Sequence, residues 1–178
     1  TQPEKDARGR LVGYWELTQT RGGKTETRHR ENIVYDKQGR IVSYRDNATS
    51  DDAPGLNIET VRSKMVYDPH GQLTGYVDET FQREGGLLLK QLITKRRGIV
   101  LDARGRVLQY DETQSGDGLG GERRIERRNM THDDRSRVTG YEETVYDPDG
   151  LKTETRANNI VYNPLAQELG RLETITVS

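Results

Sequence analysis

The chain of 178 residues is poor in apolar residues, at 30%, and rich in charged ones, at 32%, yet its 28 basic and 29 acidic residues nearly cancel. A net charge of −1 gives no electrostatic reason to expect nucleic acid as a partner, the lack of cysteine excludes disulfides and thiolate metal sites, and no apolar run is long enough for membrane insertion. Low hydrophobicity alone is typical of disorder, but nine tyrosines at regular positions favour an ordered repeat array.

The stretch 33–44 contains the clearest local signal, which predicts a β-hairpin. Two short apolar runs flank a polar break that begins at Asp36 and ends at Gly39. Asp favours the first position of a type I turn, and glycine adopts positive φ without steric cost. The break therefore predicts a type I turn followed by a left-handed glycine that forms a bulge.

This hairpin recurs along the whole chain, so that 1–178 reads as one repeat array. Units begin at the turn anchors Asp6, Asp36, Asp68, Asp102, Asp133 and Asn163. The third residue after the anchor is glycine in the first four units and then changes, in the order Gly9, Gly39, Gly71, Gly105, Ser136 and Ala166. Apolar residues stand three positions before the later anchors, at Ile33, Met65, Ile99, Met130 and Ile160.

Tyrosines form two rows in this pattern. One row lies eight residues after the anchors, at Tyr14, Tyr44, Tyr76, Tyr110 and Tyr141. The other lies directly before the anchors, at Tyr35, Tyr67 and Tyr162. We expect these tyrosines to form cross-strand rows on the sheet, where such pairs add roughly 0.2–1 kcal/mol each.

A second break of variable length lies midway in each unit and completes a pair of extended segments of about ten residues. Its versions are Arg21-Gly22-Gly23, Asp51 to Gly55, Glu84-Gly85-Gly86, Gly116 to Gly121, and Asp147 to Gly150. The pattern predicts an all-β fold, an antiparallel meander of about 11–12 strands that curls into a spiral or open barrel or stays a single-layer sheet. A parallel β-solenoid is the alternative. The last unit is atypical, and either caps the array or shifts its register.

The string Tyr-Asp-x-x-Gly-Arg-apolar at residues 35–41, with Gln for Arg at residues 67–73, resembles the YD repeat of the RHS/YD-repeat family. The repeats here are longer than is usual in that family. The resemblance implies a continuous β-strand spiral within a large secreted or cell-surface protein, of bacterial origin, and in toxin complexes a hollow shell around a cargo polypeptide. The sequence begins just ahead of one unit and stops inside another, shows no signal peptide, and is expected to be a fragment of such a protein.

The sequence offers no convincing catalytic, metal or cofactor site. The three histidines, His29, His70 and His132, lie in different units and phases, and the Asp147 to Gly150 segment lacks the remaining ligands of a calcium loop. Neighbours such as Glu142 and Glu143 point to opposite faces of a strand. The basic clusters 95–97 and 123–128 alternate with acids, which is typical of a solvated face rather than a nucleic-acid groove.

We therefore expect a non-enzymatic structural module that serves as scaffold, spacer or shell. Its partners would be neighbouring repeats of the parent chain. Two alternatives remain: an adhesin or glycan-binding module that uses the variable loops or the tyrosine rows, and a segment of a cargo-encapsulating toxin shell. Unpaired edge strands also predict self-association.

Overall fold

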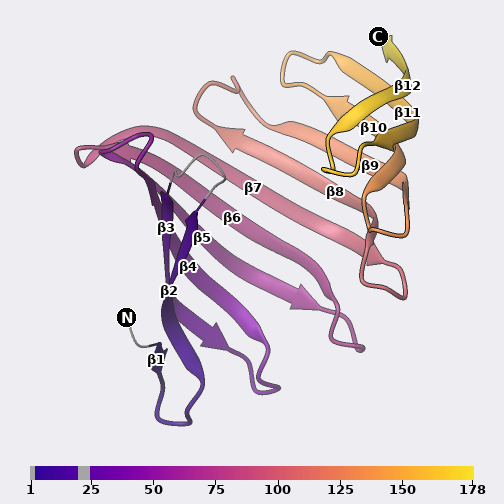
Figure 1. Ribbon diagram of the computed structural model, residues 1–178. Helices are drawn as coiled ribbons and strands as arrows, with labels where there is room; N and C mark the ends of the chain where they lie inside the picture. Colours follow the sequence, from indigo (N-terminus) through magenta and orange to yellow (C-terminus); the bar gives the residue numbers. More distant parts are fainter. Residues whose placement is uncertain (1–2, 20–24) are drawn as a thin grey trace. The chain divides into compact units, whose positions relative to one another are not determined.

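The computed structural model describes residues 3–19 and 25–178, and the strands in these ranges follow one another in a single open sheet. The twelve strands are β1 (Glu4–Lys5), β2 (Leu11–Gln19), β3 (Thr25–Tyr35), β4 (Ile41–Ser50), β5 (Leu56–Tyr67), β6 (Leu73–Glu84), β7 (Leu87–Leu101), β8 (Val107–Gly116), β9 (Arg123–His132), β10 (Val138–Tyr146), β11 (Lys152–Tyr162) and β12 (Glu168–Val177). Their order in the sheet is their order in the chain (Figure 1). No helix that could cross a membrane occurs in these described residues.

The predicted antiparallel meander is confirmed. Strand pairs such as β3–β4 and β10–β11 are antiparallel, so the β-solenoid alternative is wrong. The reason lies in the tight turns, because a short turn can only return the chain beside the strand that it leaves. The chain divides into two compact units, the first running to Val66 and including Tyr76–Thr94, and the second comprising Tyr67–Gly75 and Lys95–Ser178.

All six turns at the anchors have the same geometry. At Asp6 the carbonyl accepts a hydrogen bond from the Gly9 amide at 2.9 Å, and the Asp6 amide donates to the carbonyl of Arg10 at 2.8 Å. The Asp6 carboxylate accepts the amides of Arg8 and Arg10 at 2.9 Å. Asn163, the anchor of the last unit, accepts the corresponding two amides through its side-chain oxygen. Asp and Asn are interchangeable here because both offer that oxygen at the same reach.

The third residue after the anchor is left-handed in every unit, with φ of 77° at Gly9 and 81° at Gly39. Ser136 and Ala166 adopt φ of 63° at the same place, although a side chain makes this conformation unfavourable. The turn of the last unit therefore keeps the geometry of the others and accepts local strain.

A bulge four residues before each of the five later anchors interrupts the strand that enters the turn. The bulge residues have positive φ between 51° and 61° and are Asn32, Lys64, Gly98, Asn129 and Asn159. The register shifts beside Asn32, between Glu31 and Val34. A bulge adds local twist and re-aims the following side chains.

Part of the small apolar core lies beside these bulges. Ile33, Ile99, Met130 and Ile160, which stand three residues before their anchors, are buried, as are Ile125, Val145 and Ala157. Val34, next to Ile33, is 50% exposed. Apolar residues thus lie partly near the constant turns, whereas Ile125 and Val145 are directly opposite each other at the variable-turn ends of β9 and β10. The core is thin, as the low apolar content suggests.

The variable turns differ from one another in the structure. Gly85 and Gly86 form a two-residue turn with φ of 56° and 87°, whereas Asp147 and Gly150 reproduce the geometry of the anchor turns, with a Gly150 amide to Asp147 carbonyl distance of 3.0 Å. The break at Arg21-Gly22-Gly23 lies outside the described residues.

Candidate functional site

The most extensive polar feature of the sheet is a row in which arginines alternate with tyrosines. Tyr14 lies directly opposite Arg30 on the neighbouring strand, and Tyr44 lies directly opposite Arg62. In the second unit Tyr110 faces Arg127 in the same way. We call this row the Arg–Tyr ladder. Its members are Tyr14, Arg30, Tyr44, Asp46, Arg62, Tyr76 and Asp78 in the first unit, and Arg96, Tyr110, Glu112, Arg127, Tyr141 and Glu143 in the second.

The guanidinium of a ladder arginine lies close to the ring of one tyrosine, the near tyrosine, and farther from the ring of a second, the far tyrosine. The Arg30 guanidinium carbon lies 3.9 Å from the ring centroid of Tyr44 and 5.7 Å from that of Tyr14. Arg62 repeats this with 4.0 Å to Tyr76 and 5.7 Å to Tyr44. The ring of Tyr44 is consequently in contact with two cations, an arrangement worth about 0.5–2 kcal/mol per contact, depending on desolvation.

Each ladder arginine also binds a carboxylate that lies two residues beyond its near tyrosine on the same strand. We call one arginine, its near tyrosine and this carboxylate a rung. In the first unit the contact is a two-armed fork: Arg30 Nε and Nη2 donate to the two oxygens of Asp46, both at 2.7 Å. Arg62 and Asp78 form the same fork at 2.7 and 2.6 Å. Side chains of these pairs are between 14% and 25% exposed, so solvent screens them only in part.

In the second of the two compact units, which includes residues 95–178, glutamate replaces aspartate as the carboxylate of the ladder. The geometry of its contact with arginine changes accordingly. Arg96 donates through Nε and Nη2 to a single oxygen of Glu112, which leaves the other oxygen to accept from Gln114 at 2.7 Å. Glu112 is only 5% exposed and is the one buried charged residue in the described part of the chain. Arg127 likewise donates twice to one oxygen of Glu143.

Contacts and burial within the rungs raise the pKa values of two arginines and two tyrosines. The hydrogen bonds from Arg30 to Asp46 raise the pKa of the Arg30 guanidinium, and those from Arg62 to Asp78 do the same for Arg62. Burial raises the pKa of the Tyr44 and Tyr110 phenols. These shifts keep Arg30 and Arg62 charged and Tyr44 and Tyr110 neutral at physiological pH.

The sequence interpretation found the tyrosines but missed the arginines. The tyrosines eight residues after the anchors do lie in a row, but an arginine stands between successive rings, so the expected direct tyrosine–tyrosine pairs are not formed. Four arginines stand six residues before an anchor, at Arg30, Arg62, Arg96 and Arg127. That recurrence was visible, but Arg96 and Arg127 were assigned to a solvated face on the strength of their charged neighbours.

The tyrosines that precede the anchors serve a second contact, at the constant turns. The Tyr35 hydroxyl donates to the carbonyl of Leu11 at 2.7 Å, and Arg10 lies over the Tyr35 ring at 4.7 Å while its Nε donates to Asp6. Tyr162, with Val138 and Arg137, repeats this arrangement. We call the set formed by an anchor, the arginine four residues after it and the tyrosine directly before the next anchor the turn clasp. The turn clasp joins adjacent hairpins at their turn ends.

The arginine four residues after an anchor also shifts the ionisation of that anchor. The hydrogen bond from the Arg106 guanidinium, together with backbone amides, lowers the pKa of Asp102 from 3.8 to about 2. The side-chain hydrogen bond from Arg137 lowers the pKa of Asp133 in the same way.

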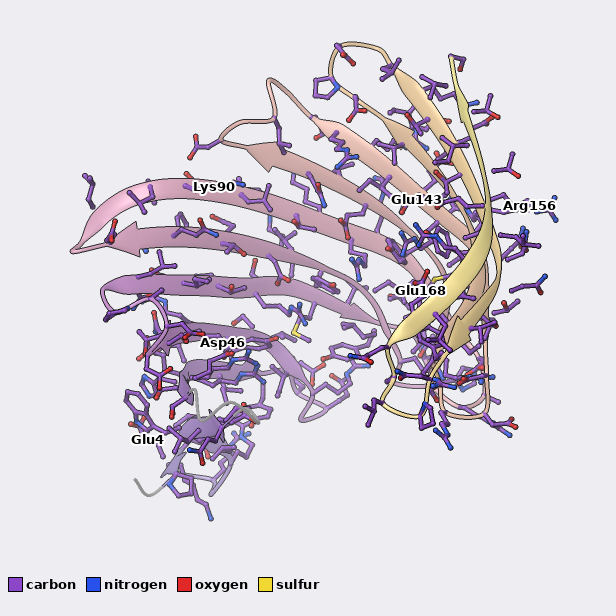
Figure 2. All side chains as sticks on the ribbon, turned by 45° about the horizontal axis from the view of Figure 1, so that its top comes forward. Glu4, Asp46, Lys90, Glu143, Arg156 and Glu168 are labelled. Carbon is purple, nitrogen blue, oxygen red and sulfur yellow. The ribbon has the colours of Figure 1, made fainter. Side chains whose placement is uncertain are left out.

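The opposite face of the sheet carries more dispersed ion pairs. Glu142 and Glu143 are neighbours in β10 but point to opposite sides: Glu143 joins the ladder, and Glu142 binds Asn129 and Arg156. Figure 2 shows Glu143 and Arg156 on opposite sides of the ribbon in this unit. The prediction that such acidic pairs do not converge on one site is confirmed.

Aromatic surface is found near the first strands. Trp15 stacks on His29 with centroids 4.1 Å apart, is itself 51% exposed, and lines a shallow depression of about 450 Å³ with Leu17 and Thr27. Within residues 3–19 and 25–178 no group of three or more His, Cys, Asp or Glu side chains is arranged to hold a metal ion. His70 lies in the turn after Asp68, to which its amide donates.

The last unit modifies the ladder. Ala157 occupies the arginine position six residues before Asn163, and it is fully enclosed. Arg171 stands where the other units have tyrosine, and it pairs with Glu173, which occupies the carboxylate position opposite Ala157. The charge of Glu173 raises the pKa of Arg171. The cation has therefore moved from β11 to β12 and keeps the carboxylate as its partner.

Comparison with known proteins gives no relative: no protein-family model, curated protein or solved structure matches this chain.

Proposed function

We propose that the chain is a non-enzymatic structural repeat module, a scaffold or spacer within a large secreted or cell-surface protein of the YD-repeat type. The observation that carries this proposal is the Arg–Tyr ladder, whose rungs place the same three side-chain types on successive strands. Such a row joins neighbouring repeats rather than building a site in any one of them, as in proteins whose stability is a sum of repeat and neighbour contributions.

The ladder also explains how a sheet with so few apolar residues holds its form. Charge-assisted hydrogen bonds between partly buried groups contribute about 1.5–3 kcal/mol each, and stacking on tyrosine adds to them. A shell segment around a cargo polypeptide is a special case of the same role, and the same contacts would support it.

Deletion of one complete repeat tests the proposal. Removing residues 36–67 joins Tyr35 to Asp68, which recreates the Tyr-Asp junction of the other units. A modular array should remain folded, with the β-sheet circular dichroism of the parent and one cooperative unfolding transition. The control removes residues 36–51, half a repeat, which takes out a single strand and should abolish cooperative unfolding. If both deletions unfold the protein alike, the module interpretation is wrong.

Glycan binding is a second candidate at one place only. Trp15 offers an exposed ring beside Leu17, whereas the rings of Tyr44 and Tyr110 each lie between two guanidinium groups and do not present a free face to a sugar. A glycan array tests this candidate. Saturable binding that Trp15→Ala abolishes and Tyr44→Leu preserves would favour it over a purely structural role.

A further inference from the structure

The β2 edge of the sheet carries an incomplete ladder rung. Tyr14 and Glu16 stand eight and ten residues after Asp6, the positions that Tyr44 and Asp46 occupy after Asp36. Arg30 lies on the far side of Tyr14, at 5.7 Å. Among the described residues no guanidinium lies on the near side of Tyr14. Arg28 is directly opposite Glu16 on β3 but pairs with Glu26, and Glu16 is exposed.

The complete rungs show what fills this position elsewhere. The near arginine always comes from the preceding strand, at 3.9 Å for Tyr44, 4.0 Å for Tyr76, 4.1 Å for Tyr110 and 4.4 Å for Tyr141. In each case it also binds the carboxylate two residues beyond that tyrosine. The binding position for the arginine, which we call the seat, therefore consists of one tyrosine ring and one carboxylate on the same strand.

The short strand β1 fixes the register in which the seat would be filled. Glu4 pairs with Gly13 and Lys5 with Leu11, and relative to the anchor this is the register of Val34 with Ser43 and of Tyr35 with Ile41. In the later hairpins this register leads to Arg30 opposite Asp46 and Ala157 opposite Glu173. Continued by the same rule, the residue directly before Thr1 lies opposite Glu16.

We propose that β2 is a docking edge for a strand that continues β1 and carries an arginine at the position directly before Thr1. That arginine stacks on Tyr14 and forks onto Glu16, as Arg30 does with Tyr44 and Asp46 in the next hairpin. The occupant is thus a preceding repeat of the same polypeptide, and the inference rests on the proposed repeat-module function.

Two copies of this chain joined through their β2 edges do not meet the requirement. An antiparallel pairing of β2 with itself brings Glu16 near Glu16 of the other copy and provides no arginine. Like charges facing each other across strands are unfavourable, so this edge discriminates against self-pairing while it accepts an arginine-bearing strand.

The test adds six residues ahead of Thr1 in the full chain. The first variant carries Asn-Ile-Glu-Thr-Val-Arg, the sequence of residues 57–62, so that its arginine directly precedes Thr1. Matched controls end in alanine or lysine instead. We expect the arginine extension to raise Tm by about 2–4 °C more than the alanine extension, with lysine between them, because only arginine makes both the fork and the stack.

Variants of the seat and the single tryptophan make the result decisive. In Glu16→Gln and Tyr14→Leu backgrounds the advantage of the arginine extension should disappear. Trp15, the only tryptophan, lies between these two residues and reports strand addition by a blue shift of its fluorescence.

Equal stabilisation by the arginine and alanine extensions would overturn the proposal, as would an unshifted Trp15 spectrum with every extension. Either result leaves the repeat-deletion experiment untouched, so failure of the docking edge is distinguishable from failure of the structural-module function.

Discussion

The regular rungs and the last repeat both pair the ladder carboxylate with an arginine, but the arginine comes from different strands. In the regular rungs the arginine comes from the strand before the carboxylate, as with Arg96 and Glu112. In the repeat that begins at Asn163 the cation comes from the carboxylate's own strand, where Arg171 pairs with Glu173, the residue opposite the enclosed Ala157. A cation beside the carboxylate is kept in both, whereas the strand that supplies the cation differs.

The two solutions differ in how strongly they join strands. An arginine that reaches from one strand to the next resists their separation, whereas a pair within one strand, on the exposed edge β12, resists it less. The position of β12 at the end of the strand order is visible in Figure 1. The comparison therefore predicts a gradient of sensitivity, large at the regular rungs and small in the last unit.

Arg96→Ala should have the largest effect. It leaves the Glu112 carboxylate buried with only Gln114 as a partner, and loss of such a charged contact costs about 2–4 kcal/mol of unfolding free energy. Chemical denaturation measures it. Arg156→Ala, which removes an arginine that is 67% exposed, is the matched control and should change stability by less than about 0.5 kcal/mol. Similar losses in both variants would contradict the ranking.

Ala157→Arg should convert the last unit toward the regular pattern, but only with a second change. Alone it crowds an enclosed site and places two guanidinium groups beside Glu173, and overpacking of this kind costs about 1–3 kcal/mol. Adding Arg171→Tyr restores the regular arrangement and should recover most of the loss. A double-mutant cycle by denaturant unfolding measures the coupling. Strictly additive effects would show that the two positions do not exchange the same cation.

Ala166→Gly and Ser136→Gly should each stabilise the protein by about 0.5–1 kcal/mol, because glycine removes the strain of the left-handed backbone at φ of 63°. Gly39→Ala is the reverse control. A Cβ at Gly39 would meet no atom within 4 Å, so its loss of stability would report backbone conformation alone. Thermal unfolding that ranks these variants otherwise would refute this explanation.

The smallest expected effect is the pH dependence of a single anchor turn, in which Asp102 binds Arg106. The pKa of Asp102 is about 2 in the folded protein and 3.8 in the unfolded chain, so its stabilising contribution is present above pH 4 and is lost as the pH falls through 2. Asp102→Asn keeps the acceptor oxygen, as Asn163 does, and removes this titration. The stability difference between the two proteins should shrink between pH 4 and 2. If the stability difference between the two proteins stayed constant over that interval, titration of Asp102 would be excluded as the source of the difference.

Much of the fold could be predicted because its determinants are local. Asp36 and Gly39 specify a turn through a carboxylate that binds two nearby amides and a residue that accepts positive φ, and both operate within four residues. Repetition of that turn every thirty or so residues implied the antiparallel meander. The bulges were not predicted, although Asn32, Asn129, Asn159 and Gly98 are of the residue types that most readily adopt positive φ, and Lys64 alone among the five departs from this pattern.

The ladder could be predicted only in part. Tyr14, Arg30 and Asp46 are sixteen residues apart in succession and lie on three different strands, so their contact depends on the register between strands. A shift of one residue in either pairing would send alternate side chains to the opposite face.

The sequence by itself determined the strands, the anchor turns and the order of the hairpins, because these follow from interactions among residues close in the chain. Only the tertiary structure decided that arginines fill the spaces between tyrosines and that Arg171 replaces the missing cation at residue 157. The physical reason is that cation–π contacts and carboxylate forks require distances of a few ångströms, which the pairing of distant strands alone can set.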